Sequence, residues 1–436
     1  MRLDYPEGTS VRNFLIVFGE DIIVEMIEVV SEQKALNKAN RSERVMIRDA
    51  FPIILYLFLS PFYFFPSGQP QIADFVLILG VAFVIMRNHG IIWPKSFFVR
   101  VYYLFLINIV LVNLLTAFFL QTTGPVLPTL YYIYNAIVVF FILNLFVSHG
   151  GNLLKAIFWS VSISSLFQFA LIVARMDFTR FRQVGFFNNP NQLGYYSLIN
   201  LALIAITSQK VRVSRSFLFV ILLANIFLVM LSNSKAALIS SIFIILPLLL
   251  RFLSRRRYKR TSMTLLLFII PVLLIFFLVY GSSIVSSMEN LVQNTQRRLS
   301  TIGMDSDDDL LGRGYGRIAL YPEFTLYGAA EGIGPGNDPR YDDPYMGSEI
   351  HSTFGTLLFS YGFVGLVTFL IMLIIATDWT SLVSITSFAA ISFYSLTHQG
   401  LRFTNVWIFL VVAFLMKTGA GNNIADYSLI PRKTMK

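Results

Sequence analysis

Residues 97–120 read FFVRVYYLFLINIVLVNLLTAFFL, an apolar stretch in which Arg100 is the one charged side chain. A helix needs roughly 20 apolar residues to cross the hydrocarbon core of a bilayer, so this stretch predicts a membrane span. Similar stretches predict further spans at 50–66, 72–87, 129–148, 153–174, 190–208, 215–231, 235–253, 262–283, 351–376, 380–396 and 403–417. The first contains Pro52 and Pro61, which predict a kinked or partly re-entrant helix.

The composition is that of a membrane protein. Of the 436 residues, 56% are hydrophobic and 13% are charged, whereas a soluble domain keeps about a quarter of its residues charged. We therefore predict an all-α polytopic membrane protein with about twelve transmembrane helices. The chain has no cysteine, which excludes disulfides and thiolate metal sites.

The distribution of Lys and Arg predicts how the chain is threaded through the membrane. The formal net charge is +10, and cytoplasmic loops carry an excess of positive charge. If both termini are cytoplasmic, the basic run 251–260 is cytoplasmic too. This topology explains the positive net charge, so no nucleic-acid partner is needed to explain it. The same topology predicts a cytoplasmic segment at 1–48, transmembrane helices 1–9 at 49–283, a large extracytoplasmic loop at 284–350, transmembrane helices 10–12 at 351–417 and a cytoplasmic tail at 418–436.

Residues 11–48 predict an amphipathic helix followed by a basic run. Phe14, Phe18, Ile22 and Met26 recur at helical spacing, as in helices that lie on a bilayer surface. A partner-binding segment fits the same pattern, and both interpretations stay open.

Arginines on the extracytoplasmic side run against the usual charge bias. Arg180 and Arg182 precede the span 190–208, which the chain enters through Asn188 and Asn189-Pro190-Asn191. Proline suits the first turn of a helix, free amides at a helix start attract anions, and arginine matches phosphate oxygens. The loop therefore predicts an anion site, with arginines paired to lipid headgroups as the alternative.

Three further cations fall outside by the same threading. Lys235 begins the span 235–253, where it is either functional or extended toward the interface. Arg313 and Arg317 lie in a glycine-rich part of the large loop, and tyrosines such as Tyr321 follow them. Aromatic faces suit sugar rings, but a loop that packs a small core of its own has the same composition. The acidic run 305–309 lacks the glycine and distal Glu of a calcium loop, so we expect no metal there.

His351 stands where the large loop meets the next apolar segment. A histidine titrates near neutral pH and can take a proton from a hydroxyl group, and Glu349 could orient its ring. A purely structural histidine is the alternative. His398 and Arg402, in the outside turn before the last span, form a weaker second pair.

Three blocks of the sequence resemble the O-antigen ligase and polymerase family of membrane enzymes that assemble polysaccharides. They are RQVGFFNNPN at 182–191, SNSKAA at 232–237, and GIGPG at 332–336 followed by HSTF at 351–354 and YGFVG at 361–365. The resemblance covers about residues 180–375. Lys235 stands where the family usually has arginine, and Ser352 replaces an Asn that often follows the ligase histidine, which favours a polymerase.

The resemblance implies a glycosyltransferase in the bacterial inner membrane that uses no nucleotide sugar, cofactor or metal. Its donor would be a glycan on undecaprenyl diphosphate, and a chain-length regulator and a flippase would be its partners. His351 would be the general base. Arg182, helped by Arg180, Lys235, Arg313 and Arg317, would bind the diphosphate. The supporting residues would be Glu349, Asn188, Asn191, Tyr321, His398 and Arg402.

Two alternatives remain at this point. A ligase would transfer the glycan to lipid A–core, whereas a polymerase would transfer it to another lipid-linked repeat unit. A transporter of lipid-linked sugars is a different class of protein, which usually has internal repeats and charges near the bilayer midplane. The chain has no repeat between its halves, and Asp74, Lys235 and Asp378 fall near predicted span ends.

Overall fold

The computed structural model describes residues 44–88, 95–175, 182–253, 316–332, 340 and 350–418. The chain divides into two compact units, 1–51 and 52–436. In the first unit the described residues 44–51 are helical. The candidate site described below lies in the second unit.

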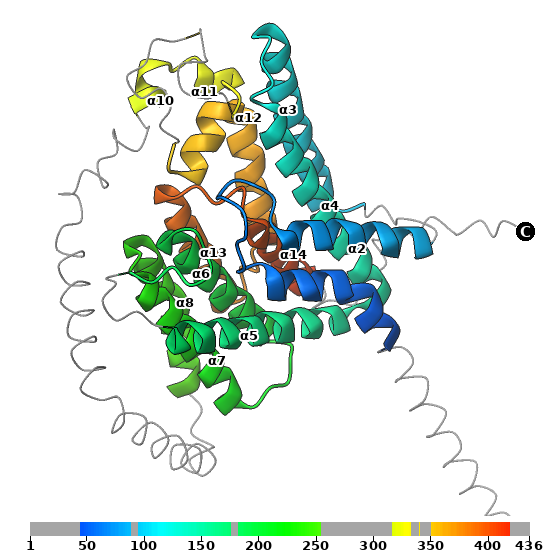
Figure 1. Ribbon diagram of the computed structural model, residues 1–436, viewed down its shortest axis with the longest axis vertical. Coiled ribbons are helices and arrows are strands. Elements are labelled where there is room, and N and C mark those ends of the chain that lie inside the picture. The colour runs from blue at the N-terminus through cyan, green and yellow to red at the C-terminus, as the bar shows by residue number, and fades with distance from the viewer. Residues whose placement is uncertain are drawn as a thin grey trace, which may run out of the picture. The chain divides into compact units, whose positions relative to one another are not determined.

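The described part of the chain is helical and contains no β-strand (Figure 1). The first described helix runs over 44–59. The labelled helices that follow are α2 (Ile72–Asn88), α3 (Phe97–Phe119), α4 (Val126–His149), α5 (Gly151–Ala174), α6 (Pro190–Thr207), α7 (Arg215–Ser232), α8 (Lys235–Leu253), α10 (Gly316–Leu320), α11 (Phe324–Tyr327), α12 (Thr353–Ala376), α13 (Leu382–Thr397) and α14 (Thr404–Thr418).

The prediction of an all-α membrane protein is confirmed, but the number of spans stays a prediction. Among the described residues five helices, α3, α4, α5, α7 and α12, are long and apolar enough to cross a bilayer, and shorter apolar helices occupy 235–248, 382–397 and 404–418. The predicted span 262–283 lies outside the described residues.

The helix predicted at 50–66 ends earlier than its hydropathy indicates. It stops at residue 59 and a turn follows at Ser60 and Pro61. Proline disfavours helical geometry in the residue before it, so Pro61 accounts for the end of the helix. Residues 60–71 consequently form a loop, which becomes a wall of the site described below.

Two helices form the centre of the second unit. Every residue of α6 from Leu193 to Thr207 is buried, and so is every residue of α14 from Thr404 to Met416. The two helices contact each other, and α6 also contacts α5, α7, α8 and α13. A helix that is apolar all round is a core helix. By contrast, α3 exposes large apolar side chains, including Leu104, Leu111 and Phe118, as a helix that faces lipid does.

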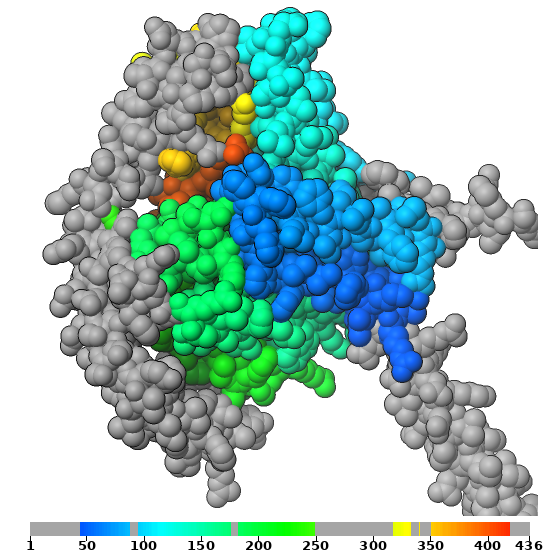
Figure 2. Space-filling model, in the orientation of Figure 1, coloured from blue at the N-terminus to red at the C-terminus, as the bar shows by residue number. Residues whose placement is uncertain are grey.

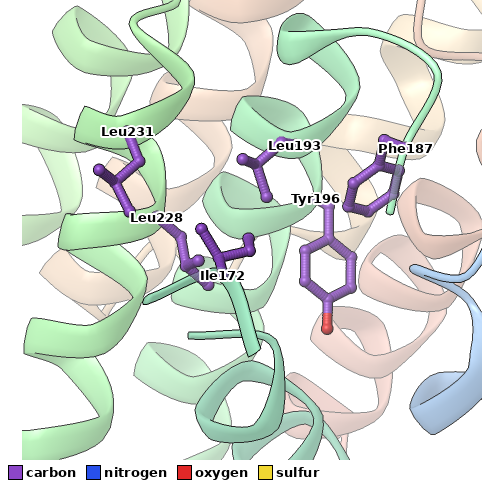
Figure 3. Packing of buried hydrophobic residues seen from close by; sticks show 6 residues of the cluster. All are labelled: Ile172, Phe187, Leu193, Tyr196, Leu228 and Leu231. Atoms are coloured by element: carbon purple, nitrogen blue, oxygen red, sulfur yellow. The ribbon is translucent and has the colours of Figure 1, made fainter. Parts of the chain in front are cut away.

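The loop that carries Arg182 is held by a small apolar cluster (Figure 3). Phe187 packs among Ile172 from α5, Leu193 and Tyr196 from α6, and Leu228 and Leu231 from α7. The Tyr196 hydroxyl lies 2.7 Å from the hydroxyl of Ser164 in α5. Gly185 in this loop has φ +61°, and a Cβ there would come within 2.8 Å of Ile172 Cδ1. The glycine of the predicted anion loop is therefore a packing requirement.

Candidate functional site

A polar cavity of about 450 Å³ lies where several helices of the second unit begin or end. On the face shown in Figure 2, the blue surface of the segment before α2, the green surface of the α6 region and the orange surface around α12 to α14 meet. The cavity is lined by Tyr56, Ser60, Tyr63, Ser67, Gly68, Gln69, Gln71, Ala73, Asp74, Tyr131, Asn189, Asn191, Gln192, Tyr195, His351, Tyr394, His398, Gln399, Arg402, Phe403 and Thr404.

Helix starts dominate this cavity. Asn189 and Asn191 flank the first residue of α6, and Phe403 and Thr404 mark the start of α14. Two other lining residues precede helices. Gln71 directly precedes α2, and His351 lies two positions before the first residue of α12. The first N–H groups of a helix have no partner within it and carry partial positive charge. The two central helices therefore offer the cavity an electrostatic preference for anions.

Arg182 adjoins the cavity through Asn191. Its Nη2 donates to Asn191 Oδ1 at 2.6 Å and its Nε donates to the carbonyl oxygen of Ser232 at 3.1 Å. The side chain of Asn189 caps α6 by accepting from the Gln192 N–H at 2.9 Å. The guanidinium group thus ties the start of α6 to the end of α7.

The first two sequence blocks meet in space at this point. The Gln183 N–H donates to the carbonyl oxygen of Leu231 at 2.9 Å, and Asn233 ends α7 in a left-handed conformation. A Cβ at Gly194 of α6 would come within 2.7 Å of Ser232 Oγ, so the absence of a side chain lets α6 approach the turn before Lys235. Neither Arg182 nor Lys235 lines the cavity itself.

Glu331 anchors the described end of the large loop. Its side chain is 7% exposed, and Oε1 accepts from Arg402 Nη2 at 2.5 Å, Arg402 Nε at 2.9 Å and Gln399 Nε2 at 2.9 Å. Oε2 accepts from the hydroxyls of Tyr361 at 3.0 Å and Tyr132 at 3.3 Å. A buried carboxylate needs such partners to offset its lost hydration. The Arg402 side chain stays 34% exposed and lines the cavity.

The two predicted histidines line the same cavity. His351 is exposed and precedes Ser352, whose hydroxyl caps α12 by accepting from the Gly355 N–H at 3.1 Å. The His398 ring stacks on Tyr394 with centroids 4.5 Å apart, and its Nδ1 lies 3.0 Å from the hydroxyl of Thr397. The Thr353 N–H donates to the carbonyl oxygen of His398 at 3.2 Å. This bond joins the start of α12 to the end of α13, which carry His351 and His398.

Behind Glu331, the helix α12 is broken at Gly362, where φ is +66° and ψ is −173°. Such a break frees carbonyl groups that a regular helix would pair. The N–H groups of Ala329 and Ala330 donate to the carbonyl oxygens of Phe359 and Ser360 at 2.8 and 2.9 Å, and Asn108 Nδ2 donates to that of Tyr361 at 2.9 Å. A Cβ at Gly365 would lie 3.3 Å from Asn108 Nδ2. Gly362 and Gly365, the two glycines of a Gly-x-x-Gly motif, therefore let α12 accept the backbone of residues 329–330 and the side chain of Asn108.

The remaining predicted residues lie elsewhere. Arg317 places its guanidinium carbon 5.8 Å from the centroid of the Phe359 ring, and Tyr321 packs against the cluster of Phe324, Ala329, Ile350 and Phe359. For Tyr321 the structure thus favours the small-core alternative. Asn188 Nδ2 donates to the carbonyl oxygen of Phe65 at 3.0 Å, which supports the loop 60–71 behind the cavity. Arg180, Arg313 and Glu349 lie outside the described residues.

Sequence reasoning did not identify one wall of the cavity. Tyr63, Gln69, Gln71 and Asp74 line it, whereas in the sequence Asp74 stands out only as a charge near a span end. A Pro-rich break at 61–70 in the first apolar stretch was the available signal for a structured loop. Among the described residues, no group of three or more His, Asp or Glu side chains is placed to hold a metal ion.

The fold and this cavity define a class: a helical membrane protein with a polar, cation-bearing site at the ends of its helices. Residues 217–370 match the family model described as O-antigen ligase, and this match confirms the resemblance to the O-antigen ligase and polymerase family. The match supports a membrane-embedded enzyme of polysaccharide assembly acting on lipid-linked glycans. It includes the Lys235 turn and His351 but not Arg182, His398 or Arg402. No curated protein matches the chain.

Proposed function

We propose that the protein is a glycosyltransferase that moves a glycan from undecaprenyl diphosphate to a sugar hydroxyl of another lipid-linked repeat unit, on the extracytoplasmic side of the bacterial inner membrane. The observation that carries the proposal is the convergence of His351, His398 and Arg402 on one cavity at the starts of α6 and α14. These groups supply a proton acceptor and a region of positive potential in one place.

The diphosphate of the donor occupies the cationic part of this cavity. Arg402 lines the cavity and presents the planar donor geometry that suits phosphate oxygens. The starts of α6 and α14 add backbone N–H groups with partial positive charge. Arg182 acts indirectly, because it does not line the cavity but holds Asn191 at the first turn of α6. Positive charge here stabilises the negative charge that develops on the leaving diphosphate.

His351 takes the proton of the acceptor hydroxyl. The hydroxyl oxygen attacks the anomeric carbon of the donor, the bond from that carbon to the diphosphate oxygen breaks, and undecaprenyl diphosphate leaves with the bonding electron pair. A single displacement of this kind inverts the configuration at the anomeric carbon. The roles of Lys235, Arg180, Arg313 and Glu349 in diphosphate binding or in orienting His351 remain predictions of the sequence.

The alternative acceptor is lipid A–core, and the matched family model fits a ligase and a polymerase equally. Ser352 in place of the Asn that often follows the ligase histidine favours the polymerase. Both reactions use the same donor site and the same base, so the acceptor decides between them.

Reconstitution of the purified protein in liposomes with undecaprenyl-diphosphate repeat units tests the proposal. A polymerase gives a ladder of lengthening glycans from these units alone. A ligase gives no product until lipid A–core is added. Absence of product under both conditions, from protein that is folded in the same liposomes, would contradict the proposed function.

A further inference from the structure

Two groups of different chemistry are found among the residues that line the cavity. His351, His398 and Arg402 belong to one group, which carries the cations. The other comes from the segment 56–74 and holds hydroxyl, amide and carboxylate groups but no cation. Members of both groups line the same cavity, together with Tyr131.

Asp74 is the acidic member of the second group. Its Oδ2 accepts from the Gln71 N–H at 2.7 Å, and its Oδ1 accepts from the Tyr134 hydroxyl at 2.9 Å. No Lys, Arg or His of the described residues forms an ion pair with it. A carboxylate oxygen can accept more than one hydrogen bond, and a partly buried carboxylate needs such donors. Asp74 therefore keeps accepting capacity on a wall of the cavity.

The wall around Asp74 is pre-organised. The Gln71 side chain, 5% exposed, accepts from the N–H groups of Phe64 and Phe65 and donates to the carbonyl oxygens of Phe65 and Gln69 at 2.9–3.1 Å. Tyr131 donates its hydroxyl to the carbonyl oxygen of Gly68, and Gln192 Nε2 donates to Ser67 Oγ at 2.7 Å. The loop 60–71 is thereby fixed against both α4 and α6.

Tyrosine side chains share the cavity with this carboxylate. The Tyr134 hydroxyl donates to Asp74 Oδ1, and Tyr56, Tyr63 and Tyr131 line the same cavity as Asp74. Aromatic faces beside hydrogen-bond acceptors suit a sugar ring, whose C–H face stacks on them while its hydroxyls donate. A phosphate group, by contrast, is repelled by a carboxylate without a cation beside it. The volume of about 450 Å³ falls in the range of roughly 300–1,000 Å³ that is typical of small-molecule sites.

We propose that Asp74, Tyr63 and Tyr131 form a sugar subsite, in which the carboxylate accepts hydrogen bonds from hydroxyls of a hexose ring. The proposal rests on the proposed function for the identity of the ring, which belongs either to the donor glycan or to the acceptor glycan. In both cases the sugar lies in the same cavity as His351 and Arg402, with its hydroxyls directed toward the acidic wall.

The first experiment measures sugar binding without any reaction. The full-length protein in nanodiscs is applied to an array of soluble microbial glycans that carry no diphosphate. We expect wild-type protein to retain a subset of them and Asp74→Asn to retain them about tenfold less, since hydrogen bonds to a charged group are worth more than those to a neutral one. Asp378→Asn is the matched control, because Asp378 does not line the cavity and holds Thr380 instead.

A second probe separates this proposal from the proposed function. Undecaprenyl diphosphate without a sugar should bind equally to wild type and Asp74→Asn, which also shows that the variant is folded, and more weakly to Arg402→Ala. With both substrates present, Asp74→Asn should raise the KM of the acceptor if the ring is the acceptor's and the KM of the donor if it is the donor's. Equal glycan retention by wild type and Asp74→Asn, or no glycan retained by wild type, would overturn the subsite. Loss of glycan transfer with glycan retention unchanged from the expectation would count against the proposed function and not against the subsite.

Discussion

Arg402 and Glu331 form a two-point contact across 71 positions of the sequence, with Nε and Nη2 of the arginine donating to Oε1 of the glutamate at 2.9 and 2.5 Å. The contact sets the end of the large loop against the turn before α14. It also holds a guanidinium group at the cavity, because the Arg402 side chain is one-third exposed whereas the Glu331 side chain is buried. The loop thus orients a group that the proposed reaction uses.

Glu331→Gln should therefore reduce donor binding as well as stability. The substitution removes the charge but keeps the size, and hydrogen bonds to charged groups contribute about 1.5–3 kcal/mol each. Because Arg402 is partly exposed, we expect the lower end of this range, with undecaprenyl diphosphate binding weakened about tenfold. A double-mutant cycle with Arg402→Ala should show strong non-additivity. Additive losses would mean that Glu331 does not act through Arg402.

His351→Ala should abolish transfer while leaving the protein folded and able to bind its donor. The side chain is exposed at the cavity and caps no helix, since Ser352 caps α12, so its removal should cost little stability. Product formation in liposomes and donor binding by fluorescence are the measurements. His398→Ala serves as the comparison. Full activity of His351→Ala would remove the proposed base.

Arg182→Ala should weaken donor binding and also lower the melting temperature. Its hydrogen bonds to Asn191 and Ser232 join α6 to α7, and a charged hydrogen bond of this kind contributes about 1.5–3 kcal/mol. Asn191→Ala removes one of the two partners and should reproduce part of both effects. If donor affinity falls in Arg182→Ala but not in Asn191→Ala, the arginine contacts the diphosphate directly.

Gly362→Ala should reduce both stability and activity. A side chain at φ +66° is strained, and the added Cβ would approach the carbonyl oxygen of Leu326 to 2.5 Å. The backbone strain costs about 1 kcal/mol or more, and the clash adds to it. Thermal unfolding in detergent measures the first effect. Gly151→Ala is the control, because a Cβ at Gly151 meets nothing within 4 Å, and it should unfold like the wild type.

Hydropathy predicted the long helices well, because lipid demands an apolar stretch of fixed length whatever the helix packs against. The helices α3, α4, α5 and α12 begin and end within about three residues of the predicted spans. The helix predicted at 50–66 was wrong beyond residue 59 because Pro61 outweighs an apolar composition. The predicted span 262–283 and most of the large loop lie outside the described residues.

The candidate site was predictable only where the sequence is unusual. The bias against arginine outside marked Arg182, whereas a position where a polar segment meets a predicted span marked His351, His398 and Arg402. The last three line the cavity. The pairing of Glu331 with Arg402 depends on tertiary packing, which no local pattern encodes. Tyr56 and Tyr63 are ordinary aromatic residues in an apolar stretch, so their place beside Asp74 could not be inferred from the sequence.

The break at Gly362 has a consequence for protein engineering. The carbonyl groups that the break frees accept hydrogen bonds from Ala329, Ala330 and Asn108. Residues 316–332 of the loop and the helix α3 thus supply the donors that α12 lacks. The large loop is therefore not a cassette that can be exchanged alone between relatives to change sugar preference. A chimera that transplants residues 316–332 without α12 and Asn108 should misassemble, whereas one that moves all three together should preserve the scaffold.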